Sequence, residues 1–171
     1  EGTKQTADTC KSTDLSAEEK ELIFSNWPLY MDEDGKKYPT LDDFQKESGI
    51  KVTYNTDVNG NNEFFAKVRN QLGACEPVGR DIFVLTDWMA ARMIDLGWIQ
   101  KLDVSAVPNV TANIIEPLRG LAWDPNFDYH VPWQSGLTGI AYNADETDEV
   151  RTFEELLTRS DLKGRISLLT E

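Results

Sequence analysis

Three short stretches of the sequence place an aromatic ring beside side chains that form hydrogen bonds. They are NWPLY at 26–30, TDW at 86–88 and WQSG at 133–136. Aromatic ring faces attract ammonium groups, and a carboxylate beside them adds a charge-assisted hydrogen bond. The pattern therefore predicts a site for a small cation. Its candidate residues are Trp27, Tyr30, Asp87, Trp88, Trp133 and Gln134.

The expected strands explain why these stretches could meet. Buried strands are predicted over 21–26 and 81–85, and they end next to the first two stretches. An extended segment from residue 131 leads into the third. In an open parallel sheet, ligands bind beyond the carboxyl ends of the strands. We therefore expect all three stretches at one edge of the sheet.

Each candidate also has a purely structural interpretation. Trp88 shares a helix face with the polar residues Arg92 and Asp95, away from the apolar stripe of that helix. It could be a partly exposed ring that packs on a neighbouring loop. Trp27 and Tyr30 could be a core pair, although Pro28 between them fixes the backbone and favours rigid presentation. Asp87 could serve only as a helix N-cap.

Other chemistry finds little support in the sequence. His130 is the only histidine, so a Ser-His-Asp arrangement with a spare partner and a multi-histidine metal site cannot be assembled. No glycine-rich nucleotide loop or nucleophile-elbow motif is present. Residues 57–63 (DVNGNNE) resemble a calcium loop only faintly, and a turn before a helix fits them better. We predict no metal, no cofactor and no enzymatic activity; a carboxylate hydrolase is the competing hypothesis.

Strands alternate with helices along the chain, which predicts the α/β class with a mostly parallel sheet. Asn61 and Asn62, Asp87, and Thr152 are the expected N-caps, and Thr152 forms a capping box with Glu155. Residues 32–35 (DEDG) read as a solvated turn. The predicted strands span 21–26, 50–54, 81–85, 137–143 and 165–169, and the predicted helices span 42–48, 63–72, 88–96 and 153–157.

The domain organisation follows from these elements. Residues 1–20 are a polar tail, and 21–134 form a first lobe that lacks its C-terminal return. Residues 135–171 hold two predicted strands and one helix, too little for an independent core. This segment is therefore predicted to be the truncated start of a second lobe.

The charge balance excludes some partners. The 171 residues include 30 acidic and 17 basic ones, a formal charge of −13. Nucleic acid and anionic membrane surfaces require clustered Lys and Arg, so both are excluded as partners. The acidity suits a cationic ligand, but it equally serves solubility. There is no apolar run of 18 residues, and the first residues lack the apolar core of a signal peptide, so they read as a mature or trimmed N-terminus.

Two cysteines, Cys10 and Cys75, indicate a disulfide and an oxidising compartment. Two free thiols, or a lipid on Cys10, are the alternatives. Nine residues precede Cys10, which disfavours the lipid, because a lipid-modified cysteine is the first mature residue. A zinc site would need more ligands than two cysteines and one histidine supply.

An ordered set of segments resembles one known family. LIFSNWPLY, GIKVTYNT, NNEFFAKV, DIFVLTDWMAARM, GWIQKLD, YHVPWQSGLTGIAYN and LKGRISLLTE follow one another between Glu21 and Glu171. They resemble the spermidine/putrescine-binding proteins of bacterial ABC importers, within the extracellular solute-binding proteins. The resemblance implies a two-lobed periplasmic-binding-protein-like fold that closes on its ligand about a hinge, with this chain as the N-terminal portion.

The resemblance also assigns roles to residues. It places Trp27 and Tyr30 at a polyamine, matches Trp88 to an aromatic ligand residue and Thr86 to a hydroxyl ligand, and puts the crossing to the second lobe near residues 134–137. Glu171 matches the edge of the acidic segment that grips the amines. Pro28 and Leu29 depart from the polar pair often found there. Tight ligand binding is therefore not expected of this portion alone.

The resulting prediction is an extracytoplasmic receptor, periplasmic or at the cell surface, with or without a membrane tether, that delivers a polyamine to an ABC permease complex. The expected partners are a small cationic solute, the permease, and either the missing C-terminal part or a second copy that swaps a segment. The alternatives are a receptor for another amine or amino acid, and a sensory or interaction domain of the same fold.

Overall fold

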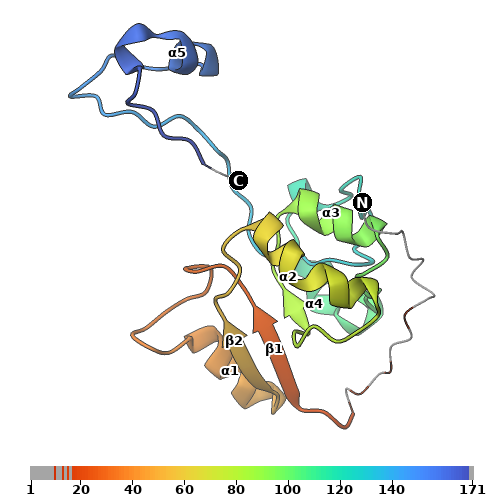
Figure 1. Ribbon diagram of the computed structural model, residues 1–171. Helices are drawn as coiled ribbons and strands as arrows, with labels where there is room; N and C mark the ends of the chain where they lie inside the picture. Colours follow the sequence, from red (N-terminus) through yellow and green to blue (C-terminus); the bar gives the residue numbers. More distant parts are fainter. Residues whose placement is uncertain (1–9, 11–12, 14, 16, 170–171) are drawn as a thin grey trace. The chain divides into compact units, whose positions relative to one another are not determined.

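The computed structural model describes residues 10, 13, 15 and 17–169 (Figure 1). Its first element is a strand, and strands then alternate with helices up to α3, so the predicted α/β class is confirmed. The elements are β1 (Glu21–Ser25), α1 (Pro39–Ser48), β2 (Lys51–Asn55), α2 (Asn61–Gly73), β3 (Ile82–Phe83), α3 (Asp87–Asp95), η1 (Val104–Ala106), α4 (Pro108–Asn113), η2 (Glu116–Leu118), α5 (Phe153–Thr158) and η3 (Ser160–Leu162).

The chain divides into two compact units, one that ends at Trp133 and one that begins at Gln134. Each is described here by itself. The first unit holds the sheet, α1 to α4, η1 and η2, and the second holds α5 and η3. That these units are the lobes of a two-lobed binding protein stays a prediction.

β1 is the central strand of a three-stranded parallel sheet with the order β2-β1-β3. It pairs with β2 over its whole length, from Glu21 opposite Lys51 to Ser25 opposite Asn55. It pairs with β3 only at Phe24 and Ser25. Since parallel strands run in one direction, the loops that follow them emerge at one edge of the sheet.

β3 is shorter than the predicted strand over 81–85. Its flanking residues still bond to β1, because Asp81 N donates to Ile23 O (2.9 Å) and Val84 N donates to Ser25 O (3.0 Å). Beyond Ser25 the chain turns toward β2, where Asn26 N donates to Asn55 O (2.8 Å). Leu85 therefore has no strand beside it to continue the ladder.

The predicted strands over 137–143 and 165–169 are wrong. Neither segment has strand geometry in the described part of the second unit. Their apolar pattern resembles a buried strand, but a strand forms only when a neighbour completes its backbone hydrogen bonds. Within residues 134–169 the two segments line a shallow hollow with α5 and do not pair with each other.

The helix boundaries follow local signals with small shifts. α1 begins at Pro39, where the fixed φ of proline suits the first turn, three residues before the predicted start. It ends at Gly49 in the left-handed conformation, with φ 71°, as the glycine predicts. The solvated turn predicted over 32–35 is confirmed, because these residues are exposed around a bridge between Asp34 and Lys37.

The predicted N-caps of α2 and α3 each lie one or two residues too late. Gly60 caps α2, and the buried Asn61 is its first helical residue. Thr86 caps α3 in extended conformation, and Asp87 is the first helical residue. A carboxylate in the first turn still interacts favourably with the helix dipole, so the sequence signal was real although the position was wrong.

α2 and α3 supply most of the hydrophobic core, and they lie together in Figure 1. Each large apolar side chain that is removed from water contributes about 1.5–3 kcal/mol. Trp27, Phe83 and Trp98 pack against this cluster from outside the two helices. The fully or nearly buried members are Val58, Phe64, Phe65, Val68, Met89 and Met93.

The other face of the sheet carries a row of aromatic rings. Successive residues of a strand point to opposite faces, so Phe24 points away from the α2 side that Ser25 faces. The Phe24 ring packs edge-on against the rings of Tyr54 and Trp133, with a distance of 5.4 Å between ring centroids in each pair. Tyr38 extends the row, because its ring centroid lies 4.7 Å from that of Tyr54. This row connects the sheet to the last residue of the first unit.

Arg80 holds three segments together near the carboxyl end of the sheet. Its Nε donates to Ser25 Oγ at the end of β1 (3.1 Å), and its Nη1 donates to Val78 O (3.0 Å). Its Nη2 forms an ion pair with Asp57 after β2, and the guanidinium lies over the Phe64 ring at 5.6 Å. A planar guanidinium with several donors suits this fixed geometry better than a lysine would.

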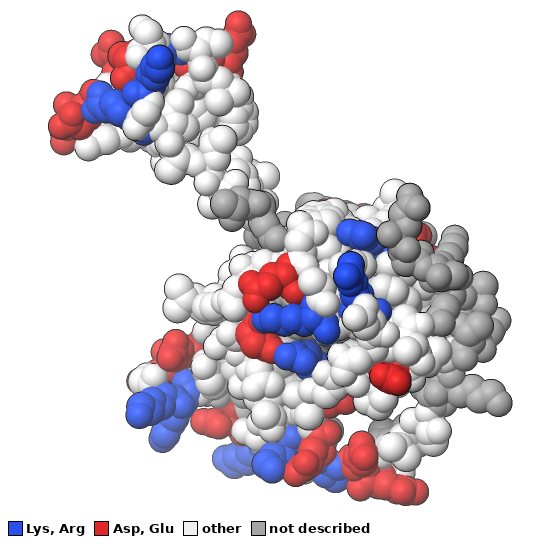
Figure 2. All heavy atoms as spheres, viewed as in Figure 1, with Lys and Arg blue, Asp and Glu red and all other residues white. Residues whose placement is uncertain are grey.

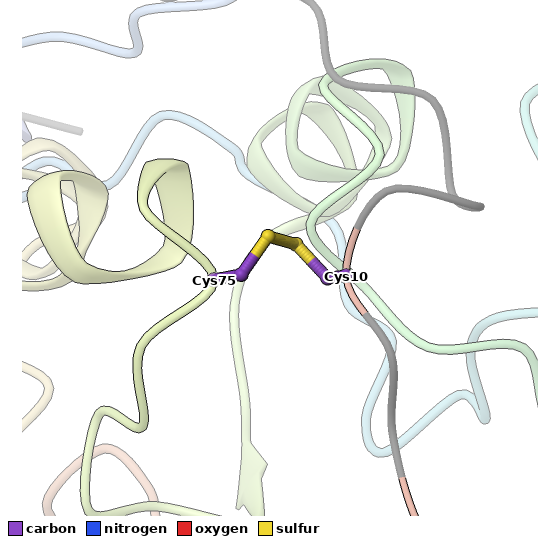
Figure 3. Close-up of a disulfide and its surroundings, with 2 residues drawn as sticks. All are labelled: Cys10 and Cys75. Atoms are coloured by element: carbon purple, nitrogen blue, oxygen red, sulfur yellow. A yellow bond between two sulfur atoms is a disulfide. The ribbon is translucent and has the colours of Figure 1, made fainter.

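A disulfide joins Cys10 to Cys75, just after α2 (Figure 3). Glu76 N donates to Gln71 O (2.8 Å), which shapes the turn around Cys75. The bond closes a loop with a sequence separation of 65 residues, and this loop contains β1, α1, β2 and α2. Both alternatives for the cysteines, free thiols and a lipid on Cys10, are therefore absent from the structure.

The second unit has a small apolar centre under a well-capped helix. Thr152 Oγ1 accepts from Glu155 N (3.1 Å), as the capping box predicts. The Glu155 carboxylate accepts from Arg151 N (2.7 Å) instead of from Thr152 N. Val150 and Leu162 are buried, whereas Leu157 of α5 is exposed.

Replacement of Cys10 by Ser is expected to lower the free energy of unfolding by about 4 kcal/mol, because the closed loop of 65 residues no longer restricts the unfolded chain. Urea titration followed by circular dichroism measures this change. Dithiothreitol should destabilise the wild type to the same level and leave Cys10→Ser unaffected. Equal stability of the oxidised wild type and the variant would contradict this role.

Stability below about pH 4 is expected to depend on Asp57. Burial of Asp57 favours its neutral form, but hydrogen bonds from Arg80 and Ser25 outweigh it and hold the pKa of Asp57 below its ordinary value. The stabilisation is therefore complete above the unfolded pKa of about 3.9 and is lost as the pH falls through the lower folded pKa.

Asp57→Asn should cost about 2 kcal/mol at pH 7, since a charged hydrogen bond is lost, and flatten the acid dependence of the unfolding free energy. Asp43→Asn, at an exposed position of α1, is the matched control. Identical acid profiles for the Asp57 and Asp43 variants would refute the assignment.

Candidate functional site

Asn26 sets the direction in which the chain leaves β1. It is fully buried, and its Oδ1 accepts from Trp27 N (2.8 Å). Its backbone carbonyl accepts from Val58 N (3.3 Å), so the segments after β1 and β2 are tied to each other. Asn26 thereby fixes the start of the stretch that carries the first two candidate rings.

Trp27 is anchored by its indole. Its Nε1 donates to Val84 O (3.1 Å), and its ring packs against the hydrophobic core. The Tyr30 ring lies 6.4 Å away at an interplanar angle of 37°. The alternative interpretation of a fully buried pair is wrong for Tyr30, which is 40% exposed. Trp27 is half-buried, so part of each ring faces solvent.

Trp133 joins this group from a distant part of the sequence. Its Nε1 donates to the backbone carbonyl of Tyr30 (3.0 Å), and its ring packs edge-on against Phe24. The structure therefore brings Trp27, Tyr30 and Trp133 together at the carboxyl edge of β1. Because 103 residues separate the two hydrogen-bonded residues, no local pattern indicates this contact.

Thr86 is held close to this edge by Asn61. The Asn61 side chain is fully buried, and its Oδ1 accepts from Thr86 N (3.1 Å). Thr86 follows Val84, the residue that receives the Trp27 indole, by two positions. The beginnings of α2 and α3 are therefore fixed to each other beside the first aromatic stretch.

Trp88 is exposed on the first turn of α3. It lines a shallow hollow with Arg92 and Asp95, as its predicted position off the apolar stripe requires. Arg92 stacks over the Phe65 ring at 4.3 Å and covers the core from outside. In the described part of the chain, no ring contact or hydrogen bond joins Trp88 to Trp27, Tyr30 or Trp133.

Asp87 interacts with its own helix. Its Oδ1 accepts from Trp88 N (2.7 Å), and the side chain is exposed. The carboxylate can keep this bond and still offer its second oxygen to a cation. Gln134 is the exposed first residue of the second unit, and Glu171 lies outside the described residues. Among the aromatic candidates of the first unit, the structure thus brings Trp27, Tyr30 and Trp133 together, and no described ring contact or hydrogen bond joins Trp88 to them.

His130 is committed to a structural role. Asp124, which is 3% exposed, accepts from the backbone N–H groups of Asp128, Tyr129 and His130. His130 Nδ1 also lies 2.7 Å from the Asp124 carboxylate. Burial opposes ionisation of Asp124, but these hydrogen bonds hold the pKa of Asp124 below its ordinary value. The pair shapes the loop that leads to Trp133.

Sequence reasoning missed two buried residues that position the candidate stretches. Asn26 gave no signal beyond its place at the end of a strand. Asn61 was interpreted as a cap, although its side chain in fact reaches another loop. In both cases the signal that could have revealed them is a polar residue at a position that the strand or helix pattern buries.

Charged side chains of both signs lie on the surface of the protein. Acidic and basic side chains lie interspersed over the face shown in Figure 2. Burial raises the pKa of the Tyr54 hydroxyl in the aromatic row above its ordinary value. Among the residues that the structure describes, no cluster of three or more His, Cys, Asp or Glu could hold a metal ion. The described helices include none with the length and apolarity to cross a membrane.

Several proteins of known type are similar to this chain. It is 32% identical over 152 residues to the spermidine/putrescine-binding periplasmic protein of Escherichia coli K12. The matched residues make up 88% of this chain and 40% of that protein. The putrescine-binding periplasmic protein SpuD of Pseudomonas aeruginosa UCBPP-PA14 is 34% identical over 135 residues, or 77% of this chain and 33% of SpuD. The putrescine-binding periplasmic protein PotF of Escherichia coli K12 is 34% identical over 137 residues, which make up 80% of this chain and 34% of PotF.

By sequence, this chain belongs to the family of the spermidine/putrescine-binding periplasmic proteins. The chain spans about two fifths of the length of the first of these relatives and about a third of the other two. All three are named as periplasmic binding proteins, which supports an extracytoplasmic location for the chain. No protein-family model matches the chain, and no solved structure matches it significantly.

The Asn61 bond is expected to determine the position of Thr86. Asn61→Leu keeps the branched shape of the side chain but lacks the acceptor, so the Thr86 amide should exchange with solvent about fivefold faster, as the loss of a hydrogen bond worth about 1 kcal/mol implies. Hydrogen exchange followed by NMR measures this rate. Asn61→Asp keeps an acceptor at the start of α2, where a negative charge is favourable, and should preserve the protection. Equal protection in both variants would show that Asn61 does not hold the loop.

Proposed function

We propose that the chain is part of the substrate-binding component of an ABC importer and contributes the aromatic half of a polyamine site. The observation that carries this proposal is the grouping of Trp27, Tyr30 and Trp133 at the carboxyl edge of the sheet. Ligands of open parallel sheets bind at this edge, and aromatic faces attract ammonium groups. The relatives whose names include putrescine or spermidine support the same ligand class.

The proposed roles differ among the candidate residues. The exposed parts of Trp27 and Tyr30 contact the aliphatic and ammonium groups of the ligand, and the Thr86 hydroxyl and the Asp87 carboxylate accept hydrogen bonds from one amine. Trp88 covers that amine from the first turn of α3. Gln134 and Glu171 contribute from the second unit. A polyamine carries several ammonium groups, and each is stabilised by a ring or a carboxylate beside it.

Binding without chemistry is the favoured activity. The only histidine is engaged with Asp124, and the candidate site combines rings, one hydroxyl and one carboxylate. These groups hold a cation but do not form an assembled nucleophile and base. The relatives are named as binding proteins, which supports the same conclusion. Closure about the segment near Gln134 would bring the two units onto the ligand.

The second unit is proposed to begin a second lobe that further polypeptide completes. Its exposed apolar side chains support this, because several large apolar side chains left exposed on a small unit favour a covering partner. The further polypeptide is a C-terminal part of the same protein or a swapped segment of a second copy, and the permease complex is the proposed receptor of the loaded protein. The exposed residues are Leu137, Phe153, Leu157, Leu168 and Leu169.

Putrescine and spermidine are expected to shift the indole N–H signal of Trp27 in NMR spectra, whereas an anionic control such as glutamate should not. The 171-residue chain should bind weakly, and the complete product of its gene should bind more tightly, because the first unit supplies only the aromatic half. Isothermal titration calorimetry on both proteins gives the affinities.

Variants separate the ligand contacts from the fold. Tyr30→Ala removes an exposed ring and should weaken polyamine binding by about tenfold, in line with a ring–cation contact of 1–2 kcal/mol. Leu29→Ala, at an exposed neighbouring position, is the matched control. A response to other amines or amino acids but not to polyamines would reassign the ligand. Silence of the complete gene product toward every cation would refute the proposed function.

A further inference from the structure

Trp133 connects two places that the sequence keeps far apart. Its indole Nε1 donates to the Tyr30 carbonyl (3.0 Å), at the end of the loop that carries Trp27 and Tyr30. Trp133 is also the last residue of the first unit, because the second unit begins at Gln134. The side chain thus touches the candidate ligand loop, and the main chain continues directly into the crossing segment.

The ring of Trp133 is itself held in place. It packs edge-on against Phe24, with an interplanar angle of 79°, and Phe24 is a buried residue of the central strand. Aromatic pairs in this arrangement gain about 0.5–1.5 kcal/mol beyond their burial. Trp133 therefore presents its N–H group from a fixed position, and the donor is no longer available to a ligand.

The loop that receives this hydrogen bond is strained. Leu29 has a φ of 65°, in the left-handed region that side chains other than glycine rarely adopt. Its side chain is 89% exposed, so packing does not compensate for the strain. Such a conformation persists when the surroundings impose it. Trp27, anchored at Val84, fixes one side of Leu29, and the Tyr30 carbonyl, anchored at Trp133, fixes the other.

We propose that Trp133 is a positioning residue that couples the loop at 27–30 to the crossing segment at 134–136. The hydrogen bond to the Tyr30 carbonyl keeps the loop in its strained conformation and keeps the end of the first unit against the sheet. When the loop changes, Trp133 and the backbone that follows it change as well. This role goes beyond the direct ligand contact expected for Trp133 from the sequence, and its ligand-dependent part rests on the proposed function.

The test uses the 171-residue chain labelled with ¹⁵N. Trp133→Phe keeps a ring beside Phe24 but removes the N–H donor. Without ligand, the heteronuclear NOE should fall both at residues 29–31 and at residues 134–136. Trp123→Phe is the matched control, since Trp123 lies in the same part of the chain and its ring contacts His130 instead. This control should leave both segments unchanged, and thermal melting shows that each variant is folded.

The results separate coupling from a local packing effect. A change in only one of the two segments, no change in either, or the same change in the Trp123 variant would overturn the proposal. If Trp133→Phe does not fold, Trp133→His decides instead, because its ring can still donate to the Tyr30 carbonyl and should keep both segments ordered if the bond matters.

A second measurement adds putrescine. In the wild type, the shifts that putrescine causes near Trp27 should extend to residues 134–136, and in Trp133→Phe they should stop at the loop. Shifts that reach 134–136 equally in both proteins would overturn the coupling. If putrescine causes no shift in either protein, the proposed ligand is wrong, and the ligand-free measurement still decides whether Trp133 couples the two segments.

Discussion

The backbone of β1 imposes the main constraint on the first unit. A central strand has hydrogen-bonding groups on both sides, and each side needs a partner strand. β2 and β3 meet this need from positions up to about 60 residues along the sequence, and both run parallel to β1. The connections between them must cross over the sheet, so α1 and α2 follow from the same requirement. The edge where the candidate residues lie therefore exists because β2 and β3 complete the backbone hydrogen bonds of β1.

Polar residues that are buried or partly buried then convert this edge into a defined arrangement. The buried Asn61 and the partly buried Arg80 bond through their side chains to loops other than their own, and Asn26 reaches the loop after β2 through its backbone carbonyl. Together they fix the segments that follow the three strands. Such bonds are individually modest, but an unpaired buried polar group is costly, so alternative loop arrangements are disfavoured. The aromatic side chains of the site rest on this framework. Rigid placement reduces the entropy that a ligand must offset on binding.

Local patterns predicted α1, α2, α3 and α5 well but not α4, because caps and apolar spacing are encoded within a few residues and the stretch that forms α4 lacks a clear apolar period. The left-handed Gly49 and the Thr152 capping box are examples. The strands over 137–143 and 165–169 were not predicted correctly, since pairing depends on a neighbour that a local pattern cannot specify. The hydrogen bond between Trp133 and Tyr30 could not be predicted either, because it joins residues that are 103 positions apart. The aromatic candidates were recognised by type, but the structure was needed to show which of them meet.

The disulfide makes β1, α1, β2 and α2 part of one covalent ring. A single cut in the backbone of that ring, for example in the exposed turn at 32–37, opens the ring without producing two molecules. Both pieces stay joined through the two sulfur atoms, and the β1–β2 ladder keeps its hydrogen bonds across the cut. In a compartment rich in proteases, a cut at this turn therefore leaves the two pieces covalently joined as long as the environment stays oxidising. In a reducing environment the disulfide opens, and only non-covalent contacts hold the pieces together.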